Sequence, residues 1–386
     1  MNVAEVILFG SFFWAAFGYA LYPILIWTAS RLCGRAEQPP AMDDGALPSL
    51  TLLIVAHNEE QVLAARLENA LAIDYPREKL QVVVASDGSR DGTAQIARSF
   101  ADCGVRLLDY QPNRGKSATL NAAWQELTTD LVLLSDANTF TAPDAARRLA
   151  RWFASPEVGA VCGRLVLIDP QSGNNVDGLY WKYETFLKKC EARLGALLGA
   201  NGAIYAIRRE AFVAIPPETI VDDFVIPLLA KLKTGCRLIY AADAVAHEET
   251  PPGIADEFRR RVRIGAGGFQ SLGVLWPFLH PRHGWLAFSF WSHKVLRWFC
   301  PFFLLAAFLS NLLLLAEAPY RATMAAQAVF YAVAWLGGRV PLQGAVGRLI
   351  RLTTMFGSMN AALLLGFFRL LSGRQRGAWQ RTARTG

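Results

Sequence analysis

Four long runs without a charged residue divide this chain into membrane and globular parts. The first covers residues 6–30, and the later ones cover 298–316, 322–338 and 352–368. A helix needs about 20 apolar residues to cross the hydrocarbon core of a bilayer. The run at 6–30 and the run at 298–316 therefore predict spanning helices. The last two are shorter, and they could be tilted, re-entrant or interfacial.

A cleaved signal peptide is the alternative for the first run. Signal peptides begin with basic residues and carry a shorter apolar stretch, whereas the only early charge here is Glu5 and the run has 25 residues. We therefore expect a retained anchor. The predicted order is the anchor at 1–30, a linker at 36–48, a globular domain at 48–253, amphipathic interface helices at 254–297, a membrane bundle at 298–371 and a basic tail at 372–386.

The net charge of +7 is concentrated beside the apolar runs. Arg31 and Arg35 follow the first run, and arginines from Arg369 to Arg384 follow the last one. Basic flanks face the cytoplasm, which predicts a multi-pass protein of the plasma membrane with a cytoplasmic globular domain. Three later crossings would leave the basic tail outside, so the number of late spans and the side of the C-terminus stay open. The globular part has no basic stripe interleaved with aromatic residues, which argues against nucleic-acid binding.

The six cysteines show no C-x-x-C pair or other metal-ligand spacing. A cytoplasmic domain keeps its thiols reduced. We expect these residues to serve in packing.

Short apolar segments alternate with helical patterns in the globular part. Strands are predicted at 49–56, 80–85, 105–108 and 131–134. A helical pattern runs through Val62, Leu63, Leu67 and Leu71. A further helix is predicted from 93 to 103, and the stretch NRGKSATLNAAW, which begins at Asn113, opens another. This alternation predicts parallel strands in a doubly wound α/β sheet.

Each predicted strand ends in a polar cluster. The clusters are HNEE at 57–60, SDGSRD at 86–91, NRGK at 113–116 and SDANT at 135–139. Taken singly, each one could be a helix cap, a turn or a solvated loop. Ligands of such sheets bind outside the carboxyl ends of the strands. Because all of the clusters fall there, together they predict a binding site.

The last cluster places Asp136 and Asn138 two residues apart, directly after a strand. Two oxygen donors at this spacing can reach one hard cation, Mg²⁺ or Mn²⁺, which in turn would hold a diphosphate. Lys116 and Arg114 offer further positive charge. The P-loop and the dinucleotide-binding glycine motif are both absent from the sequence, which argues against those classes of site.

In their order and spacing, these motifs resemble the family 2 glycosyltransferases of GT-A fold. The matching stretches are HNEE, SDGSRDGT, GKSATLNAA, SDAN, GANGAIYAIRRE and VDDF. The membrane frame is similar to the branch that holds the hyaluronan, chitin, cellulose and poly-N-acetylglucosamine synthases. The resemblance implies a Rossmann-like mixed sheet, inserted between transmembrane helices, and inverting transfer from a nucleotide sugar, usually linked to UDP.

The resemblance also implies roles for individual residues. Asp223 would be the catalytic base, with Asp222 beside it, although acids at a helix N-terminus are the alternative interpretation. The loop at 199–203 would lie under the donor sugar and the acceptor. The implied donor-binding residues are Ala56, His57, Asn58, Glu59, Asp87 and Lys116; the implied metal ligands are Asp136 and Asn138, with His247 as a further nitrogen ligand.

Two positions depart from the family pattern. The D-x-D position reads D-A-N, and the amide of Asn138 is a weaker ligand than a carboxylate. Where processive synthases carry Q-x-x-R-W, this chain has Arg260, Arg261, Val262, Arg263 and Ile264. Arg260 and Arg263 can bind diphosphate, but Ile264 replaces the tryptophan. Processivity is therefore left open.

Residues 254–275 and 285–299 carry apolar positions at helical spacing, with arginines or tryptophans beside them. They predict amphipathic helices at the membrane surface that hold the acceptor site against the bilayer; packing on the domain core is the alternative. The expected partners are the UDP-sugar donor, a glycan or lipid acceptor, membrane lipid and export partners.

Three functions stay open. The first is a glycosyltransferase of exopolysaccharide or cell-envelope glycan synthesis. The second is a single-step glycolipid synthase similar to ceramide glucosyltransferases. The third is a non-catalytic membrane scaffold, against which the intact residues Asp87, Asp136, Asp223 and Arg263 argue.

Overall fold

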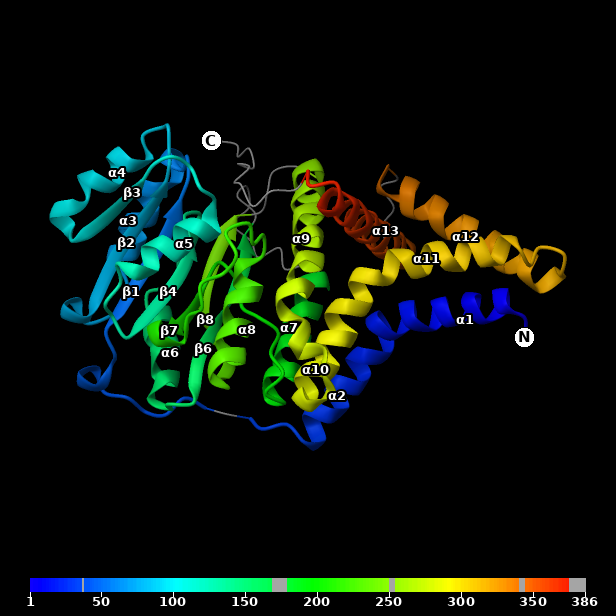
Figure 1. The fold of residues 1–386 in the computed structure, drawn as a ribbon, viewed down its shortest axis with the longest axis horizontal. Coiled ribbons are helices and arrows are strands. Elements are labelled where there is room, and N and C mark those ends of the chain that lie inside the picture. Colours follow the sequence, from blue (N-terminus) through cyan, green and yellow to red (C-terminus); the bar gives the residue numbers. More distant parts are fainter. Residues whose placement is uncertain (37, 169–178, 250–253, 340–343, 375–386) are drawn as a thin grey trace. The chain divides into compact units, whose positions relative to one another are not determined.

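The computed structural model describes residues 1–36, 38–168, 179–249, 254–339 and 344–374 (Figure 1). The chain divides into two compact units. The sheet unit comprises Trp27–Pro252 and Val274–Leu286. The helical unit comprises Met1–Ile26, Gly253–Gly273 and Ala287–Gln375.

Four parallel strands form one half of the sheet, in the order β3-β2-β1-β4. They are β1 (Leu50–Ala56), β2 (Leu80–Asp87), β3 (Val105–Tyr110) and β4 (Leu131–Asp136). The register pairs Leu50 with both Leu80 and Leu131, so these strands begin and end at nearly the same level. The four strands predicted from the sequence are confirmed, together with their parallel pairing.

The other half of the sheet makes it mixed, as in GT-A folds. Antiparallel β7 (Tyr205–Arg208) follows β4, then β6 (Val158–Ile168), β8 (Arg237–Glu249) and the three-residue strand β5 (Thr139–Thr141). The mixed sheet that the family resemblance implies is therefore confirmed, whereas the wholly parallel sheet that the alternation alone predicts is wrong for this half. Only two residues separate β5 from β4, yet β5 lies at the far edge, on β8. The sheet must curl to bring that edge back to the end of β4.

Helices cover both faces of the sheet (Figure 1). Alternate residues of β1, Leu50, Leu52 and Ile54, pack in one core cluster with Leu63 and Leu67 of α3. This period of two is expected for a strand. Burial of this cluster holds the strands in place, and so positions their carboxyl ends, where the polar loops begin. The helices of this unit are α3 (Glu60–Leu71), α4 (Thr93–Ser99), α5 (Lys116–Gln125), α6 (Ala145–Ala150), α7 (Leu179–Arg193) and α8 (Asp222–Thr234).

The predicted helix at 93–103 is shorter than expected. α4 ends at Ser99, and a separate 3₁₀ turn covers Ala101–Cys103. Phe100 between them leaves the helical region, with φ −95° and ψ 7°. Gly104 follows with φ 89°, a left-handed conformation that closes the turn and that glycine adopts without strain.

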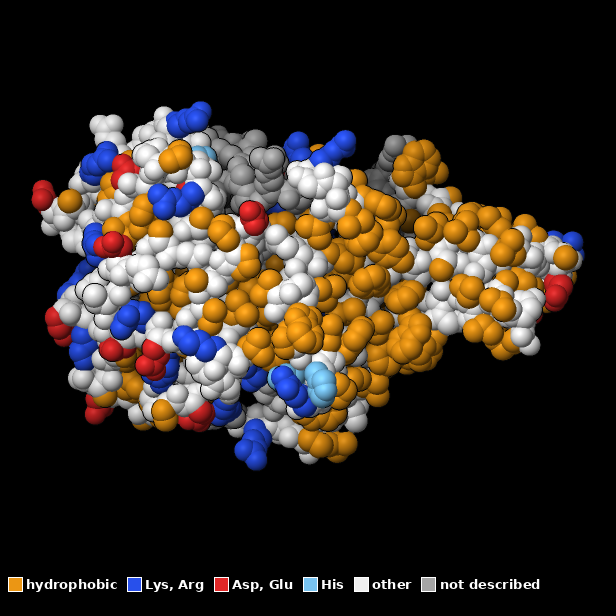
Figure 2. Space-filling model, in the orientation of Figure 1, with side chains coloured by type: hydrophobic (Ala, Val, Ile, Leu, Met, Phe, Trp, Pro, Cys, Tyr) orange, Lys and Arg blue, Asp and Glu red, His pale blue; other side chains and the backbone are white. Residues whose placement is uncertain are grey.

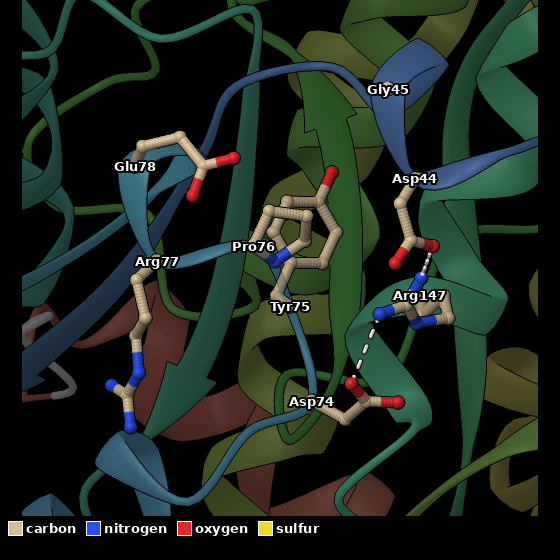
Figure 3. A pocket seen from close by; sticks show the side chains of 8 residues that line it. All are labelled: Asp44, Gly45, Asp74, Tyr75, Pro76, Arg77, Glu78 and Arg147. Carbon is tan, nitrogen blue, oxygen red and sulfur yellow. Dashed lines mark hydrogen bonds and ion pairs between the residues drawn. The ribbon is translucent and has the colours of Figure 1, made fainter.

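The linker before β1 is fastened to the amino-terminal edge of the sheet (Figure 3). Arg147 of α6 forms ion pairs with Asp44 of the linker and with Asp74, 3.0 Å away. Lys79 donates to the linker carbonyls of Gly45 at 2.7 Å and Leu47 at 2.9 Å. A cavity of about 430 Å³ lies beside these contacts. It is at the opposite edge from the polar clusters, so it is not the predicted site.

The helical unit and its neighbouring segments contain three helices that are long and apolar enough to cross a membrane, counted over the described residues. They are Val3–Leu32, Trp285–Leu312 and Gly344–Leu371. Figure 2 shows apolar side chains gathered over this part of the chain. The helices are α1 (Val3–Ala16), α2 (Tyr22–Leu32), α9 (Ile254–Leu275), α10 (Trp285–Ser289), α11 (Leu296–Leu312), α12 (Ala318–Leu336) and α13 (Gly344–Leu371).

Two predicted boundaries differ from the structure. Residues 285–299 were expected as an interface helix, but they begin the long helical run to Leu312. Most of the run at 322–338 lies in α12, which is not one of the three candidate spanning helices. The run at 352–368 lies in α13, which is one of them. α13 gains length because helix formation continues through Arg348 and Arg351, which the count of uncharged residues excluded.

Candidate active site

The loops after β1 and β2 interlock through hydrogen bonds. The backbone N–H of Asn58 donates to Ser89 Oγ at 3.1 Å, and Asn58 Oδ1 accepts from the N–H of Arg90 at 2.8 Å. The N–H of Glu59 donates to Thr93 Oγ1 at 2.7 Å. Asn58 is held at φ 55°, a left-handed conformation that asparagine tolerates better than most residues. The HNEE and SDGSRD clusters therefore lie side by side and are held together by hydrogen bonds.

Asp87 organises the third cluster. Its side chain is fully buried, and its carboxylate accepts from the backbone N–H of Arg114 at 2.8 Å and of Gly115 at 2.9 Å. Asn113 Nδ2 donates to it as well, at 3.1 Å. The ring Nδ1 of His57 lies 2.7 Å from the Asp87 carbonyl oxygen. These contacts fix the start of α5, while the proposed contact of Asp87 with a nucleotide stays a prediction.

Lys116, the first residue of α5, connects the third cluster to the remaining acids. Its Nζ lies 2.8 Å from Asp136 Oδ1 and 3.3 Å from Asp222 Oδ2. Burial alone would lower the pKa of Lys116, but Asp136 and Asp222 raise it above its ordinary value. The ammonium group therefore stays charged at neutral pH. Burial raises the pKa of Asp222, and Lys116 opposes that change.

The D-A-N turn joins the two halves of the sheet. Asp136 ends β4, and Asn138 precedes β5, which pairs with β8. Asn138 Nδ2 donates to Oε1 of Glu248 on β8 at 2.8 Å, so the amide oxygen of Asn138 stays available as a metal ligand. Glu248 was not among the predicted site residues. No sequence signal indicated it, since 110 residues separate the two partners.

The residues present fit a hard cation whose coordination shell is completed by oxygen atoms of a substrate. The carboxylate of Asp136 and the amide oxygen of Asn138 are suitable donors. His247 Nδ1 is buried without a hydrogen-bond partner among the described residues. Within those same residues, no group of three or more His, Cys, Asp and Glu side chains is arranged to hold a metal. This donor set suits a metal that arrives with phosphate oxygens rather than one held by protein alone.

Asp223 lies at the start of α8 and is oriented by the loop at 199–203. The N–H of Gly202 donates to Asp223 Oδ2 at 3.0 Å, and the N–H of Ala200 donates to the Asp223 carbonyl at 2.9 Å. A methyl group placed on Gly202 would lie 3.5 Å from Asp223 Oδ2 and 3.6 Å from Asp136 Oδ2. These two carboxylate oxygens are therefore no more than about 7 Å apart. The loop at 199–203 thus lies beside both acids, while its contact with the donor sugar and the acceptor stays a prediction.

Two buried side chains near these acids were not predicted. Tyr205 on β7 is fully buried, and its hydroxyl has no hydrogen-bond partner among the described residues. Burial and the charges of Asp222 and Asp223 raise its pKa. Arg66 of α3 is also fully buried, and burial lowers its pKa to about 10 while Asp136 opposes the change. In the sequence, Tyr205 looks like any strand residue and Arg66 like any helix residue, so no local pattern marked either one.

The remaining predicted residues lie as follows. Ala56 is the buried last residue of β1. Arg260 and Arg263 lie on α9, in the helical unit. Arg260 Nη1 is 4.0 Å from Glu257 Oε2, and Arg263 is exposed. Their contact with a diphosphate stays a prediction.

Comparisons with known proteins agree with this architecture. Residues 51–214 match the family model "Glycosyl transferase family 2". The poly-beta-1,6-N-acetyl-D-glucosamine synthase of Staphylococcus aureus (strain COL) is 26% identical over 249 residues, which are 61% of this chain and 58% of the synthase. An N-acetylglucosaminyltransferase of Rhizobium meliloti (strain 1021) is 28% identical over 281 residues, 68% of this chain and 65% of that protein. The chain thus spans less than two thirds of the length of these relatives.

A solved structure shares the fold along most of the chain. It is a mannosyltransferase from Pyrobaculum calidifontis in complex with GDP-Man and Mn²⁺, with a TM-score of 0.74 and 22% sequence identity. The match covers 96% of this chain and 100% of the mannosyltransferase. The mixed sheet, the polar loops at its carboxyl edge and the family match lead to one conclusion: residues 51–214 match glycosyltransferase family 2, within a sheet of GT-A fold that extends from Leu50 to Glu249.

Proposed function

We propose that the chain is an inverting, metal-dependent membrane glycosyltransferase that transfers a sugar from a nucleotide sugar to a glycan or lipid acceptor. One observation carries the proposal. Gly202 separates the carboxylates of Asp136 and Asp223, whose oxygens are no more than about 7 Å apart. A nucleotide sugar with its diphosphate beside Asp136 would thus have its anomeric carbon near Asp223. In-line displacement requires this arrangement.

Asp223 is the proposed base. A sugar hydroxyl becomes a good nucleophile only when its proton is removed in the transition state. The hydrogen bond from Gly202 orients one oxygen of Asp223. The carboxylate would accept the proton as the hydroxyl attacks the anomeric carbon, and the nucleoside diphosphate would leave from the opposite face. Attack opposite to the leaving group inverts the configuration.

Lys116 and the D-A-N turn are the proposed diphosphate site. The ammonium group of Lys116 already lies among acids, where it can pair with phosphate oxygens instead. Asp136 and Asn138, with His247 as a further candidate ligand, would hold Mn²⁺ or Mg²⁺, which would neutralise charge on the leaving diphosphate. Arg260 and Arg263 are proposed as further diphosphate ligands. The loops at Ala56 to Glu59 and at Asp87 are proposed to bind the nucleoside.

The names of the relatives suggest the donor and the acceptor to test first. Both relatives named above act in N-acetylglucosamine chemistry by name, which favours UDP-N-acetylglucosamine. The mannosyltransferase of similar fold was solved with GDP-Man, so a GDP-linked donor belongs in the same panel. We propose a polysaccharide product of the cell envelope, with export partners that carry it across the membrane.

A single transfer to a membrane lipid is the second candidate. Ile264 stands where processive synthases have a tryptophan that stacks on the acceptor sugar, and its side chain is 45% exposed. An exposed isoleucine offers an apolar surface rather than a stacking platform. This observation favours a lipid acceptor that leaves after one transfer.

The proposed location is the plasma membrane, with the catalytic domain on the cytoplasmic side. Three candidate spanning helices support a membrane protein. Arg31 in the last turn of the first of them, and Arg35 just after it, support the cytoplasmic side. Nucleotide sugars are supplied on that side.

The test is nucleoside diphosphate release by the full chain in detergent. UDP-N-acetylglucosamine, other UDP-sugars and GDP-mannose would be offered with membrane lipid extract and Mn²⁺ or Mg²⁺. Release with one donor should fall by roughly 10²–10⁴-fold in Asp223→Asn. Asp243→Asn is the matched control, because Asp243 is an exposed carboxylate that pairs with Arg148. Equal release by Asp223→Asn and the control would contradict the assigned base, and product size would separate polymer from glycolipid.

A further inference from the structure

A small basic pocket lies within the helical unit, between α9 and α13. Its volume is about 250 Å³. Glu257, Phe258 and Arg261 of α9 line one side, and Arg351, Thr354 and Ser358 of α13 line the other. The two helices also touch directly, since a methyl group on Gly366 would lie 2.7 Å from the backbone of Ala266. A ligand in the pocket would therefore bridge two helices that already pack together.

The pocket contains two arginines and one acid. Arg261 Nε lies 2.8 Å from Glu257 Oε1, and the Arg261 side chain is 23% exposed. This ion pair holds the Arg261 guanidinium at the pocket wall, and together with Arg351 the lining residues carry more positive than negative charge. Arginine presents several donors in one plane, a geometry that matches phosphate oxygens. The volume suits a single headgroup and is too small for a nucleotide sugar.

The position of Arg351 along α13 indicates how deep the pocket lies. Residues 352–368 carry no charge, and Arg369 follows them. Seventeen helical residues extend about 25 Å, close to the thickness of the bilayer core. Arg351 and Arg369 thus bound the apolar run and belong at the level of lipid headgroups. Thr354 and Ser358 follow one and two turns into the apolar run, at the depth of the lipid glycerol and ester groups.

We propose that this pocket binds the phosphate group of a membrane phospholipid. Arg351 and Arg261 would hold the phosphate, the hydroxyls of Thr354 and Ser358 would face the glycerol esters, and Phe258 would contact an acyl chain. Basic pockets between membrane helices are suited to anionic headgroups. The bound lipid would fasten α9 to α13. None of the residues that line the pocket is among those proposed to bind the donor, the metal or the reacting hydroxyl.

The test measures lipid retention by the full chain. The purified protein would be delipidated in detergent and titrated with dioleoyl phosphatidylglycerol, and binding would be followed by native mass spectrometry. Arg351→Gln and Arg261→Gln should each weaken binding at least tenfold. Arg351 is exposed, so its replacement does not disturb a core. Arg259→Gln is the matched control, because Arg259 is on the same helix with a 70% exposed side chain and does not line the pocket.

A second readout separates a lipid from free phosphate. Phosphatidylglycerol should raise the melting temperature of the unchanged protein, since a ligand of the native state stabilises it, and should raise that of Arg351→Gln much less. Inorganic phosphate at the same concentration should leave it unchanged. Equal lipid binding by all variants would overturn the proposed site. An equal stabilisation by inorganic phosphate would overturn the assignment to a lipid.

Discussion

Lys116 Nζ lies 2.8 Å from Asp136 Oδ1 and 3.3 Å from Asp222 Oδ2, and so joins two acids from different parts of the fold. Asp136 ends a strand of the parallel half, whereas Asp222 begins α8, just before β8. The lysine occupies the position in which it neutralises the first acid of the D-A-N turn. A metal ion that binds Asp136 must compete with this ammonium group, which gives the first prediction.

Lys116→Met should change metal binding and nucleotide binding in opposite directions. Without the competing ammonium, Mn²⁺ alone should bind the full chain roughly tenfold more tightly, since close charges interact by one to several kcal/mol near a protein surface. UDP with Mn²⁺ should bind more weakly, because the proposed phosphate partner is lost. Titration calorimetry in detergent measures both affinities.

Two variants control that experiment. Lys116→Arg keeps the charge and should leave Mn²⁺ binding weak in the absence of nucleotide. Asp136→Asn should weaken Mn²⁺ binding in either background. Unchanged Mn²⁺ affinity in Lys116→Met would show that Asp136 does not bind the metal or that Lys116 does not compete for it.

Asp222→Asn should leave the protein as stable at pH 7 as the unchanged chain, or more stable. Burial raises the folded-state pKa of Asp222 above the ordinary value of 3.8. The native state therefore binds more protons than the unfolded state from pH 3.8 up to the raised value, and stability falls as pH rises through that window. Asparagine carries no such proton. Melting temperatures from pH 4 to pH 7 should fall less in Asp222→Asn than in the unchanged protein.

Asp243→Asn is the control for this pH series, because Asp243 is an exposed acid in an ion pair with Arg148. Its melting curve should keep the pH dependence of the unchanged chain. A clear loss of stability in Asp222→Asn at pH 7 would mean that its ion pair with Lys116 outweighs the cost of burial.

Two glycines of the loop at 199–203 should respond differently to alanine. In Gly202→Ala the new methyl group meets Asp223 Oδ2 and Asp136 Oδ2 at ordinary contact distances, 3.5 and 3.6 Å. The variant should fold normally but lose at least roughly tenfold in activity, since a small misplacement of reacting groups has this effect. Gly199→Ala should instead lower stability, because Gly199 has φ +77° and its methyl group would lie 2.9 Å from Phe224.

Thermal melting and sugar transfer, measured on both glycine variants, test this contrast. Full activity in Gly202→Ala would show that the space between the carboxylates is not used by the substrate. Unchanged stability in Gly199→Ala would show that the turn can relax around the added methyl group.

The sequence predicted the parallel half of the site well, because local patterns define it. β1, β2 and β4 are apolar runs followed by turn residues, and parallel strands bring their carboxyl ends to one edge. The family resemblance implied a mixed sheet, but the individual strands of the antiparallel half were not predicted. β5 has only three residues, and its partner β8 lies about a hundred residues later. The contact of Asn138 with Glu248 depends on that pairing and on the curl of the sheet, which no local pattern encodes.

Arg66→Met should preserve or raise stability, although it replaces a fully buried charged residue. Only Nη1 of Arg66 has an observed hydrogen bond, to Asn69 Oδ1 at 2.9 Å, while Nε and Nη2 have none among the described residues. Burial lowers the pKa of Arg66 to about 10, so folding disfavours its charged form. A buried ion without a full set of partners is often replaced by an apolar side chain at no cost.

Asn69→Ala should behave in the opposite way and sharpen that test. Asn69 accepts from the backbone N–H of Thr141 at 2.9 Å and donates to the Thr141 carbonyl at 3.0 Å, so it supports the edge strand β5. Its loss would leave buried backbone groups unpaired, at about 1–3 kcal/mol. Melting temperatures of the two variants should therefore diverge. If Arg66→Met melts as low as Asn69→Ala, then Arg66 has an acceptor in solution, such as buried water or an anion near Asp136, and the interpretation of an unsatisfied cation is wrong.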